Sequence, residues 1–261
     1  MRTPQSTSEI SAHRFQCSFL PIEPHYLEKH RTLQLATMST VKGSRVTKSK
    51  VKKSPIRRVP KVLPLVERTN ALPAEEFITK YVTCDETSPN TVDIYSADTI
   101  SDSDLEACLD LVEQTSSEAY TASSTGWSRP KKRKEMKLPD MKYLIVRGES
   151  SGPSARDVTG FLSFMVTYED GKEVVYCYEI HLSPTVRGQG IGKLLMERME
   201  GVGRAVGLEK VMLTVFRSNG VATRFYERLG YGVDEYSPGP RRLRNGTIKE
   251  PDYLILSKGL K

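Results

Sequence analysis

The sequence is short of the residues that build metal sites and disulfide frameworks. It has 4 cysteines and 4 histidines in 261 residues, and neither set shows a metal-ligand or C-x-x-C spacing. We therefore expect no bound metal and reduced thiols. Cys108 and Cys177 stand among apolar residues, which predicts two buried thiols that pack as small hydrophobic side chains.

Long apolar runs are missing as well. None approaches the roughly 18 to 20 residues that a membrane-spanning helix needs. Together with the reduced thiols, this predicts a soluble, intracellular protein without a membrane partner.

Acidic residues are absent from the segment 38–61. That segment holds nine Lys and Arg residues, and without them the remainder of the chain carries −2 of the formal net charge of +7. The basicity therefore belongs to a tail, and any contact with nucleic acid that it implies applies to the tail alone. We predict a disordered N-terminal region over 1–73, with the basic stretch at 38–61, and one folded domain over 74–261.

The folded part alternates strand and helix patterns, which is typical of a mixed α/β sheet. A hydroxyl at Ser103 and a carboxylate at Glu106 form a capping-box pattern, which predicts a helix over about 103–118. Arg129 to Lys134 is a second, shorter basic run, and residues 237–251 are interpreted as a long basic loop. The predicted strands are 143–147, 160–168, 174–182, 210–216, 231–234 and 253–256, with a hairpin turn at 169–172 and a helix capped by Asn219.

The most informative motif is the turn Arg187-Gly188-Gln189-Gly190-Ile191-Gly192-Lys193, between a strand and a helix. Three glycines at alternate positions predict positive φ angles and a backbone that can approach a ligand closely. Amide groups at the start of a helix favour anions, so the turn predicts a pyrophosphate site, with Arg187 and Lys193 adding charge. A Walker motif is excluded because Leu194 stands where Ser or Thr is required, and a Rossmann fingerprint would have its acid after the turn rather than before it.

This turn, the preceding Tyr178-Glu179-Ile180-His181-Leu182 and the later Phe225-Tyr226-Glu227-x-Leu229-Gly230-Tyr231 resemble the GCN5-related N-acetyltransferase (GNAT) superfamily. The resemblance implies a single mixed, mostly antiparallel sheet flanked by helices, with acetyl-CoA as cofactor. Further segments, at Gly126-Trp127, 176–179, 211–216 and Ser237-Pro238, resemble the NatD family. Those enzymes acetylate the N-terminal serine of core histone tails that begin Ser-Gly-Arg-Gly.

The chemistry of acetyl transfer, together with the resemblance, assigns candidate roles to three groups of residues. Glu179 is the candidate general base, acting through a water, and Tyr178 or Tyr253 is next in line. Backbone amides near Ile180 and Leu182 are expected to polarise the thioester. The expected cofactor contacts are Ile180, His181, Leu182, Arg187, Gly188, Gln189, Gly190, Ile191, Gly192, Lys193 and Asn219; the expected peptide contacts are Tyr120, Trp127, Thr167, Tyr168, Glu169, Tyr178, Thr214 and Tyr253.

Two departures from the family pattern concern the peptide side. Thr167 stands where the family has an acid, which Glu169 could replace, and Thr125 stands where it has the first of two tryptophans. Two other functions stay open: acetylation of lysine side chains or small amines, and a non-catalytic acyl-CoA-binding or chromatin-tethered module. With histone tails as substrate we expect a monomer in nucleus and cytoplasm, whose segment 38–61 could contact nucleosomal DNA.

Overall fold

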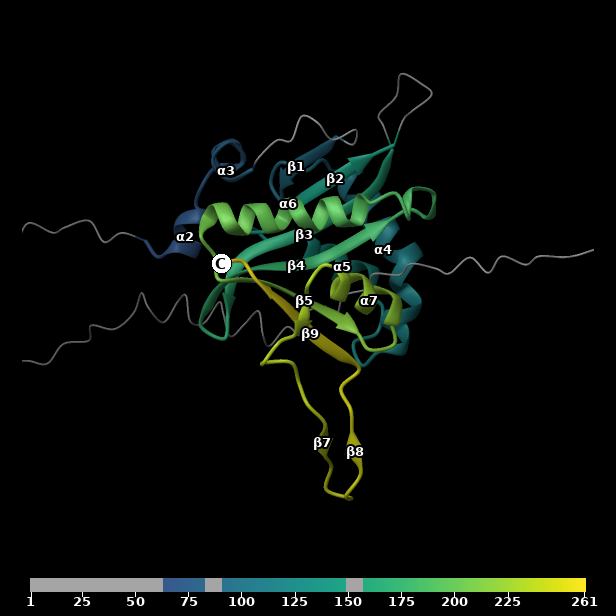
Figure 1. The fold of residues 1–261 in the computed structure, drawn as a ribbon. Helices are drawn as coiled ribbons and strands as arrows, with labels where there is room; N and C mark the ends of the chain where they lie inside the picture. Colours follow the sequence, from purple (N-terminus) through teal and green to yellow (C-terminus); the bar gives the residue numbers. More distant parts are fainter. Residues whose placement is uncertain (1–62, 83–90, 149–156) are drawn as a thin grey trace, which may run out of the picture.

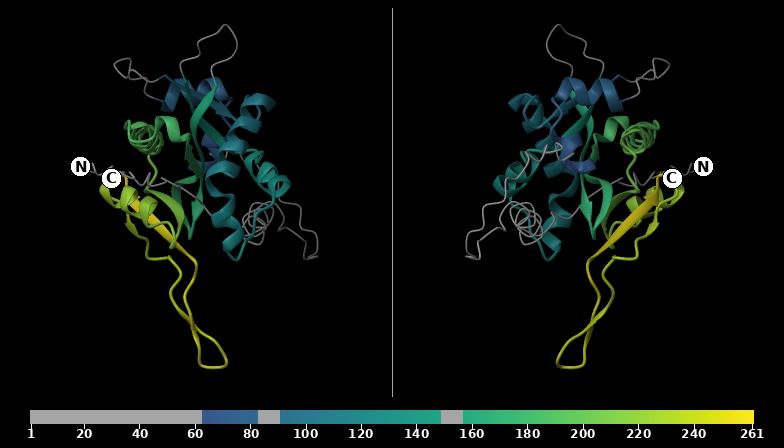
Figure 2. Two further views of the ribbon diagram at one scale, coloured as in Figure 1. Left: turned by 90° about the vertical axis from the view of Figure 1, so that its right-hand side faces the viewer. Right: turned by 90° about the vertical axis from the view of Figure 1, so that its left-hand side faces the viewer.

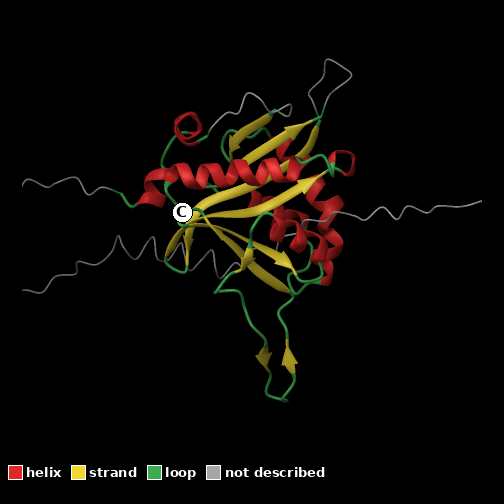
Figure 3. Cartoon of the chain, viewed as in Figure 1, coloured by secondary structure: helices red, strands yellow, loops and turns green. Residues whose placement is uncertain are grey.

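The computed structural model describes residues 63–82, 91–148 and 157–261, and these form three layers. A central sheet separates helices α4 and α5 on one face from helices α2, α3, α6 and α7 on the other (Figures 1, 2 and 3). The apolar side chains accordingly form two clusters, one on each face of the sheet. The predicted disordered region up to residue 62, including the basic stretch, lies outside the described residues.

The sheet has seven strands in the order β1-β2-β3-β4-β5-β9-β6. All neighbouring pairs are antiparallel except β4 and β5, which run parallel because α6 connects them. This confirms the predicted mixed, mostly antiparallel sheet flanked by helices. The strands are β1 Val92–Ser96, β2 Lys142–Arg147, β3 Val158–Glu169, β4 Lys172–Leu182, β5 Lys210–Phe216, β6 Gly232–Val233 and β9 Tyr253–Gly259.

Local sequence explains the boundaries of several elements. Asp170 and Gly171 both have positive φ angles, as a tight hairpin turn between β3 and β4 requires. Gly207 ends α6 in the left-handed conformation, and Asn219 caps α7 by accepting a hydrogen bond from the Ala222 amide at 3.1 Å. The helices are α2 Leu65–Asn70, α3 Ala74–Tyr81, α4 Asp102–Ala122, α5 Arg129–Met136, α6 Ile191–Val206 and α7 Gly220–Arg228. None of the helices in these described ranges is long and apolar enough to cross a membrane.

Three expectations need correction, and one basic run without a predicted structure proves to be a helix. Order begins before the predicted boundary at 73/74, because α2 packs on β3 and Tyr168 donates a hydrogen bond to Glu67. The cap of α4 is Ser101 rather than Ser103: its hydroxyl accepts from the Asp104 amide at 3.0 Å, and the helix continues to Ala122. The basic run Arg129 to Lys134 forms helix α5, and the predicted loop over 237–251 contains a hairpin, β7 Arg241–Arg242 and β8 Ile248–Lys249.

Candidate active site

The site begins with an irregularity in β4. Ser163 lies opposite Glu179, but the next residue, Phe164, lies opposite Cys177, so Tyr178 is an extra residue on β4. Such a bulge turns two consecutive side chains to the same face, and both Tyr178 and Glu179 lie on the face that α4 and α5 cover. Pairing between β4 and β5 also ends at Cys177, which opens the sheet between these parallel strands. Strand β4 therefore separates from β5 near Ile180, whose backbone amide we expected to polarise the thioester.

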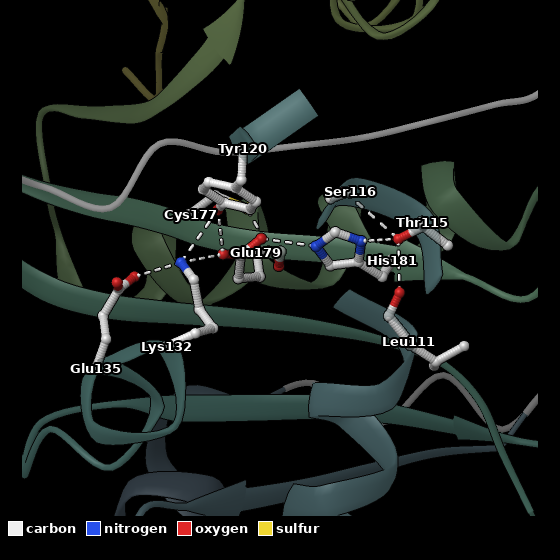
Figure 4. A network of polar contacts seen from close by, with 9 residues as sticks. All are labelled: Leu111, Thr115, Ser116, Tyr120, Lys132, Glu135, Cys177, Glu179 and His181. Carbon is white, nitrogen blue, oxygen red and sulfur yellow. Dashed lines mark hydrogen bonds and ion pairs between the residues drawn. The ribbon is translucent and has the colours of Figure 1, made fainter. Parts of the chain in front are cut away.

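Glu179 is the centre of a buried polar network (Figure 4). Its carboxylate is 1% exposed and accepts three hydrogen bonds. Lys132 donates to it from α5 at 2.7 Å, the hydroxyl of Tyr120 from α4 at 2.8 Å, and Nε2 of His181 lies 2.6 Å from its second oxygen. The other ring nitrogen of His181, Nδ1, lies 2.6 Å from the hydroxyl of Thr115. Helices α4 and α5 and strand β4 thus meet at one carboxylate.

Charge balance keeps that carboxylate ionised. Burial would raise the pKa of Glu179, but Lys132 and His181 outweigh burial and hold the pKa below its usual value. Burial would likewise lower the pKa of Lys132, but Glu135 and Glu179 hold it above its usual value. Burial raises the pKa of Glu135 in spite of Lys132. The site therefore contains a charged lysine and a charged glutamate, both almost completely buried.

Ion pairs between helices hold Lys132 in this position. The guanidinium of Arg129, at the start of α5, contacts three acids of α4: Glu106 at 2.9 Å, Asp110 at 2.7 Å and Glu113 at 2.5 Å. These acids recur at helical spacing on one face of α4. Arg133 also pairs with Asp102 and Glu106, so two of the five cations in the basic run join α5 to α4 and fix the angle at which α5 presents Lys132.

A cavity of about 210 Å³ opens beside this network, where β4 and β5 diverge. It is lined by the predicted turn and by residues that the sequence did not suggest, Thr115, Phe225 and Arg228. Of the predicted cofactor contacts, those that line it are Ile180, His181, Leu182, Arg187, Gly188, Gly190, Ile191, Gly192 and Lys193. Gln189 and Asn219 do not line it: Gln189 donates to the Thr185 carbonyl, and the Asn219 side chain caps α7.

The geometry of the turn suits an anion. Gly188 and Gly190 have φ angles of +77° and +81°, and a Cβ at either position would meet no atom within 4 Å, so their backbone is open to a ligand. Gly190 precedes α6 without a capping side chain, which leaves the first amides of the helix available. Gly192 is different, and the expectation of a positive φ there was wrong. It lies in the helix, where a Cβ would come within 3.3 Å of the Phe225 ring, so its smallness serves packing between α6 and α7.

Most predicted peptide contacts share the face of the sheet that carries Glu179. Tyr120 is buried between Trp127 and Phe216, with ring centroids 5.6 Å and 5.5 Å away. Thr214 is buried and bonds to Tyr176, which sequence reasoning had not placed in the site. Tyr253 lies opposite Phe216 on the neighbouring strand. Thr167 and Glu169 lie on the same face near the β3–β4 turn, because Thr167 is opposite Val174, a residue of that cluster.

Tyr168 does not join them. Alternation along β3 turns its ring to the opposite face, where it packs against the other apolar cluster and bonds to Glu67 at 2.9 Å. The structure therefore does not bring the Tyr168 side chain together with the other predicted peptide contacts. The residue most clearly missed is Lys132, whose only sequence signal was its place in a basic run that faces three regularly spaced acids.

Comparison with known proteins agrees with this geometry. Residues 109–231 match the sequence model of the Acetyltransferase (GNAT) family. This segment of the chain therefore has the sequence pattern of a GNAT acetyltransferase domain. It is 32% identical over 154 residues to N-alpha-acetyltransferase 40 of Saccharomyces cerevisiae, an alignment that covers 52% of this chain and 54% of that protein. It is 28% identical over 76 residues to the uncharacterized N-acetyltransferase YycN of Bacillus subtilis, covering 29% and 49%. The chain thus spans about half the length of the curated relatives it matches.

Two solved structures show weaker similarity. The PaiA N-acetyltransferase of Thermoplasma acidophilum in complex with coenzyme A has 19% identity and a TM-score of 0.46, covering 65% of this chain and 99% of that one. Arabidopsis thaliana NAA60 in complex with a bisubstrate analogue has 16% identity and a TM-score of 0.46, covering 65% and 98%. The resemblance to the GNAT family lies in the sequence matches. The match to this acetyltransferase family agrees with acetyl-CoA as the expected cofactor.

Proposed function

We propose that this protein is an acetyl-CoA-dependent N-terminal acetyltransferase. The observation that carries the proposal is the juxtaposition of two features at the divergence of β4 and β5. One is the anion-binding turn with its cavity, and the other is the buried, ionised Glu179 on the bulge beside it. The GNAT domain and the similarity to a yeast N-alpha-acetyltransferase support the same reading.

The cavity residues fit the cofactor. The open backbone at Gly188 and Gly190 and the first amides of α6 would hold its pyrophosphate, with Arg187 at the rim and the exposed Lys193 nearby. When bound, the cofactor supplies an activated thioester. Amides of β4 beyond Cys177, near Ile180 and Leu182, would polarise the thioester carbonyl, because β5 no longer pairs with the strand there.

An N-terminal amine is a suitable nucleophile for an enzyme whose candidate base is the carboxylate of Glu179. Its pKa lies near 8, about two units below that of lysine, so only modest help is needed to deprotonate it. Glu179 has the charge to accept the proton, but at 1% exposure it cannot touch the amine directly. The proton would reach it through a water, with the hydroxyl of Tyr120 fixing the orientation of the carboxylate.

For the substrate we propose histone tails that begin Ser-Gly-Arg-Gly. The resemblance to the NatD family and the yeast relative support this choice. The aromatic walls formed by Tyr120, Trp127, Tyr178 and Tyr253 suit a small N-terminus, because each ring combines a rigid apolar surface with a polar tip. Glu169 lies two residues from Thr167 on the same face and could bind the substrate arginine in place of the missing acid.

A peptide assay tests this function. Protein, acetyl-CoA and a Ser-Gly-Arg-Gly histone peptide are incubated and analysed by mass spectrometry, beside the same peptide with a blocked N-terminus. Acetylation of the free peptide alone supports an N-terminal acetyltransferase, whereas acetylation of both indicates a lysine-directed enzyme. Modification of neither peptide, with acetyl-CoA still bound, would indicate the non-catalytic module.

The cellular setting is proposed on the same basis. With a histone substrate, we propose that the protein is found in the nucleus and the cytoplasm. We also propose that it acts as a monomer. Contact between segment 38–61 and nucleosomal DNA would bring such an enzyme to chromatin through salt-sensitive phosphate contacts.

A further inference from the structure

The hairpin formed by β7 and β8 projects away from the body of the protein, beyond the end of β9 (Figures 1 and 2). Every residue from 241 to 250 is exposed, and the pair forms a sheet of its own that shares no hydrogen bond with the seven-stranded sheet. At about 3.3 Å per residue, its tip at Gly246 lies roughly 17 Å from Arg241. None of these residues packs into the core, so folding does not explain the amino-acid composition of this arm.

That composition is strongly basic. The arm contains four cations and one acid, Glu250, whose ion pair is with Arg217 outside the arm. Within the described part of the chain, none of the four cations takes part in an ion pair. They are Arg241, Arg242, Arg244 and Lys249.

The register of the arm works against its own stability. Arg241 lies directly opposite Lys249, so two like charges face each other across the strands. Such a pair is destabilising, and a two-stranded hairpin alone is only marginally stable. A polyanion between these side chains would turn the repulsion into attraction. The arm therefore has the features of a surface whose charges are neutralised by a partner.

The placement of the cations indicates the kind of partner. Arg241 and Lys249 share one face of the ribbon, and alternation places Arg242 on the other. A protein surface would contact one face only, whereas the major groove of a nucleic acid duplex admits a two-stranded ribbon and has phosphates along both walls. Three of the four cations are arginines, whose guanidinium groups bind phosphate oxygens in pairs.

From this geometry we propose that the β7–β8 arm binds the phosphate backbone of a nucleic acid. The arm begins beside the aromatic face described above, because Asp252 at its base accepts a hydrogen bond from the amide of Ser124, near Tyr120. A nucleic acid held by the arm would therefore lie next to the entrance to that face. The proposal concerns binding alone and does not depend on the proposed acetyltransferase activity.

The test measures binding of the full chain to a labelled 20-base-pair DNA duplex by fluorescence anisotropy between 50 and 200 mM salt. The variant is Arg241→Ser/Arg242→Ser/Arg244→Ser. The control, Lys80→Ser/Lys131→Ser/Lys134→Ser, removes the same charge from exposed side chains elsewhere. Each lost phosphate contact lowers the slope of log K against log salt by about 0.9, so we expect the arm variant to lose up to about 2.7 in slope. The control should keep the wild-type slope, and an arm variant that does the same overturns the proposal.

Two further measurements sharpen the result. Lys249→Glu places an acid opposite Arg241, so it should weaken duplex binding while leaving the unfolding temperature unchanged or higher. Competition with unlabelled duplex, single-stranded RNA and polyglutamate of equal charge identifies the partner. Displacement by either nucleic acid supports the proposal and shows which form the arm prefers. If polyglutamate displaces the duplex equally well, the arm is a general site for acidic polymers and the proposal fails.

Discussion

Replacement of Lys132 by methionine tests the buried network most directly. Methionine has a similar length and no charge, so the change removes one cation and little volume. The ammonium of Lys132 lies 2.7 Å from Glu179, 3.0 Å from Glu135 and 3.1 Å from the Tyr120 hydroxyl, and its side chain is 3% exposed. Its removal would leave two carboxylates in the protein interior without their shared partner.

The expected cost is large. Removal of one member of a buried ion pair costs about 3–5 kcal/mol, because the remaining charge is buried without compensation. A domain of ordinary stability has about 5–15 kcal/mol in total, so the variant should fold but unfold at markedly lower denaturant. The affected catalytic group is Glu179, so kcat/KM should fall as well.

The loss of stability in the Lys132→Met variant should depend on pH. In the wild type the pKa of Glu179 is lowered, so its contribution to stability is present above the unfolded pKa, near 4.3, and is lost as the pH falls through the folded value. Without Lys132, only His181 opposes the effect of burial, so we expect the pKa of Glu179 to rise and its carboxylate to destabilise the variant at neutral pH. Protonation removes this penalty, and the difference between the two proteins should shrink between pH 7 and about pH 4.5.

Urea unfolding at the two pH values, followed by circular dichroism, measures the effect. The control is Lys131→Met, which makes the same change at the adjacent, exposed position and should alter the unfolding free energy by less than about 0.5 kcal/mol. If Lys132→Met is as stable as wild type at pH 7, or if its deficit is independent of pH, the ion pair does not hold the site as described.

Three other predictions concern the cofactor turn, the base and the basic tail. Gly190→Val should abolish acetyl-CoA binding measured by calorimetry with the fold intact, because its φ of +81° suits glycine; Gly192→Val should instead lower thermal stability through the Phe225 contact. Glu179→Gln should reduce kcat by roughly 10²-fold or more with little change in acetyl-CoA affinity, and a pH–rate profile that keeps its lower limb would show that the proton goes elsewhere. Deletion of residues 1–61 should leave kcat/KM on a histone peptide within about twofold and weaken nucleosome association most at low salt; loss of peptide activity in a folded protein would place this segment in the active site.

Some strands and helix caps could be predicted from the sequence alone. The strand Lys210–Phe216 and the cap at Asn219 were located correctly, because alternation and capping depend on residues close in sequence. The start of α4 was misplaced because two serines, Ser101 and Ser103, both precede an acid by three positions. Sequence spacing alone does not decide between two equivalent caps.

The parts of the site that escaped prediction depend on distant neighbours. The bulge at Tyr178 appears only when β3 supplies the register, and without it alternation would place Tyr178 and Glu179 on opposite faces. Tyr168 was grouped with the peptide contacts through the family resemblance, whereas alternation along β3 places its ring on the opposite face. Helix α5 has few apolar residues, so periodicity gave no sign of it. Its order comes from ion pairs with α4, a helix seven residues earlier in the chain.

Two basic runs of similar composition thus have opposite physical roles. In α5, Arg129 is matched by three acids of α4, and Lys132 is buried against Glu179, so positive charge there assembles the interior of the site. In the β7–β8 arm, Arg241 faces Lys249 and its environment is solvent, so positive charge there is available to a partner. Both runs are rich in positive charge, but only the first faces a helix with acids at matching spacing. Acids at spacings of three or four residues on a facing helix therefore distinguish the structural basic run from the one that we propose binds a partner.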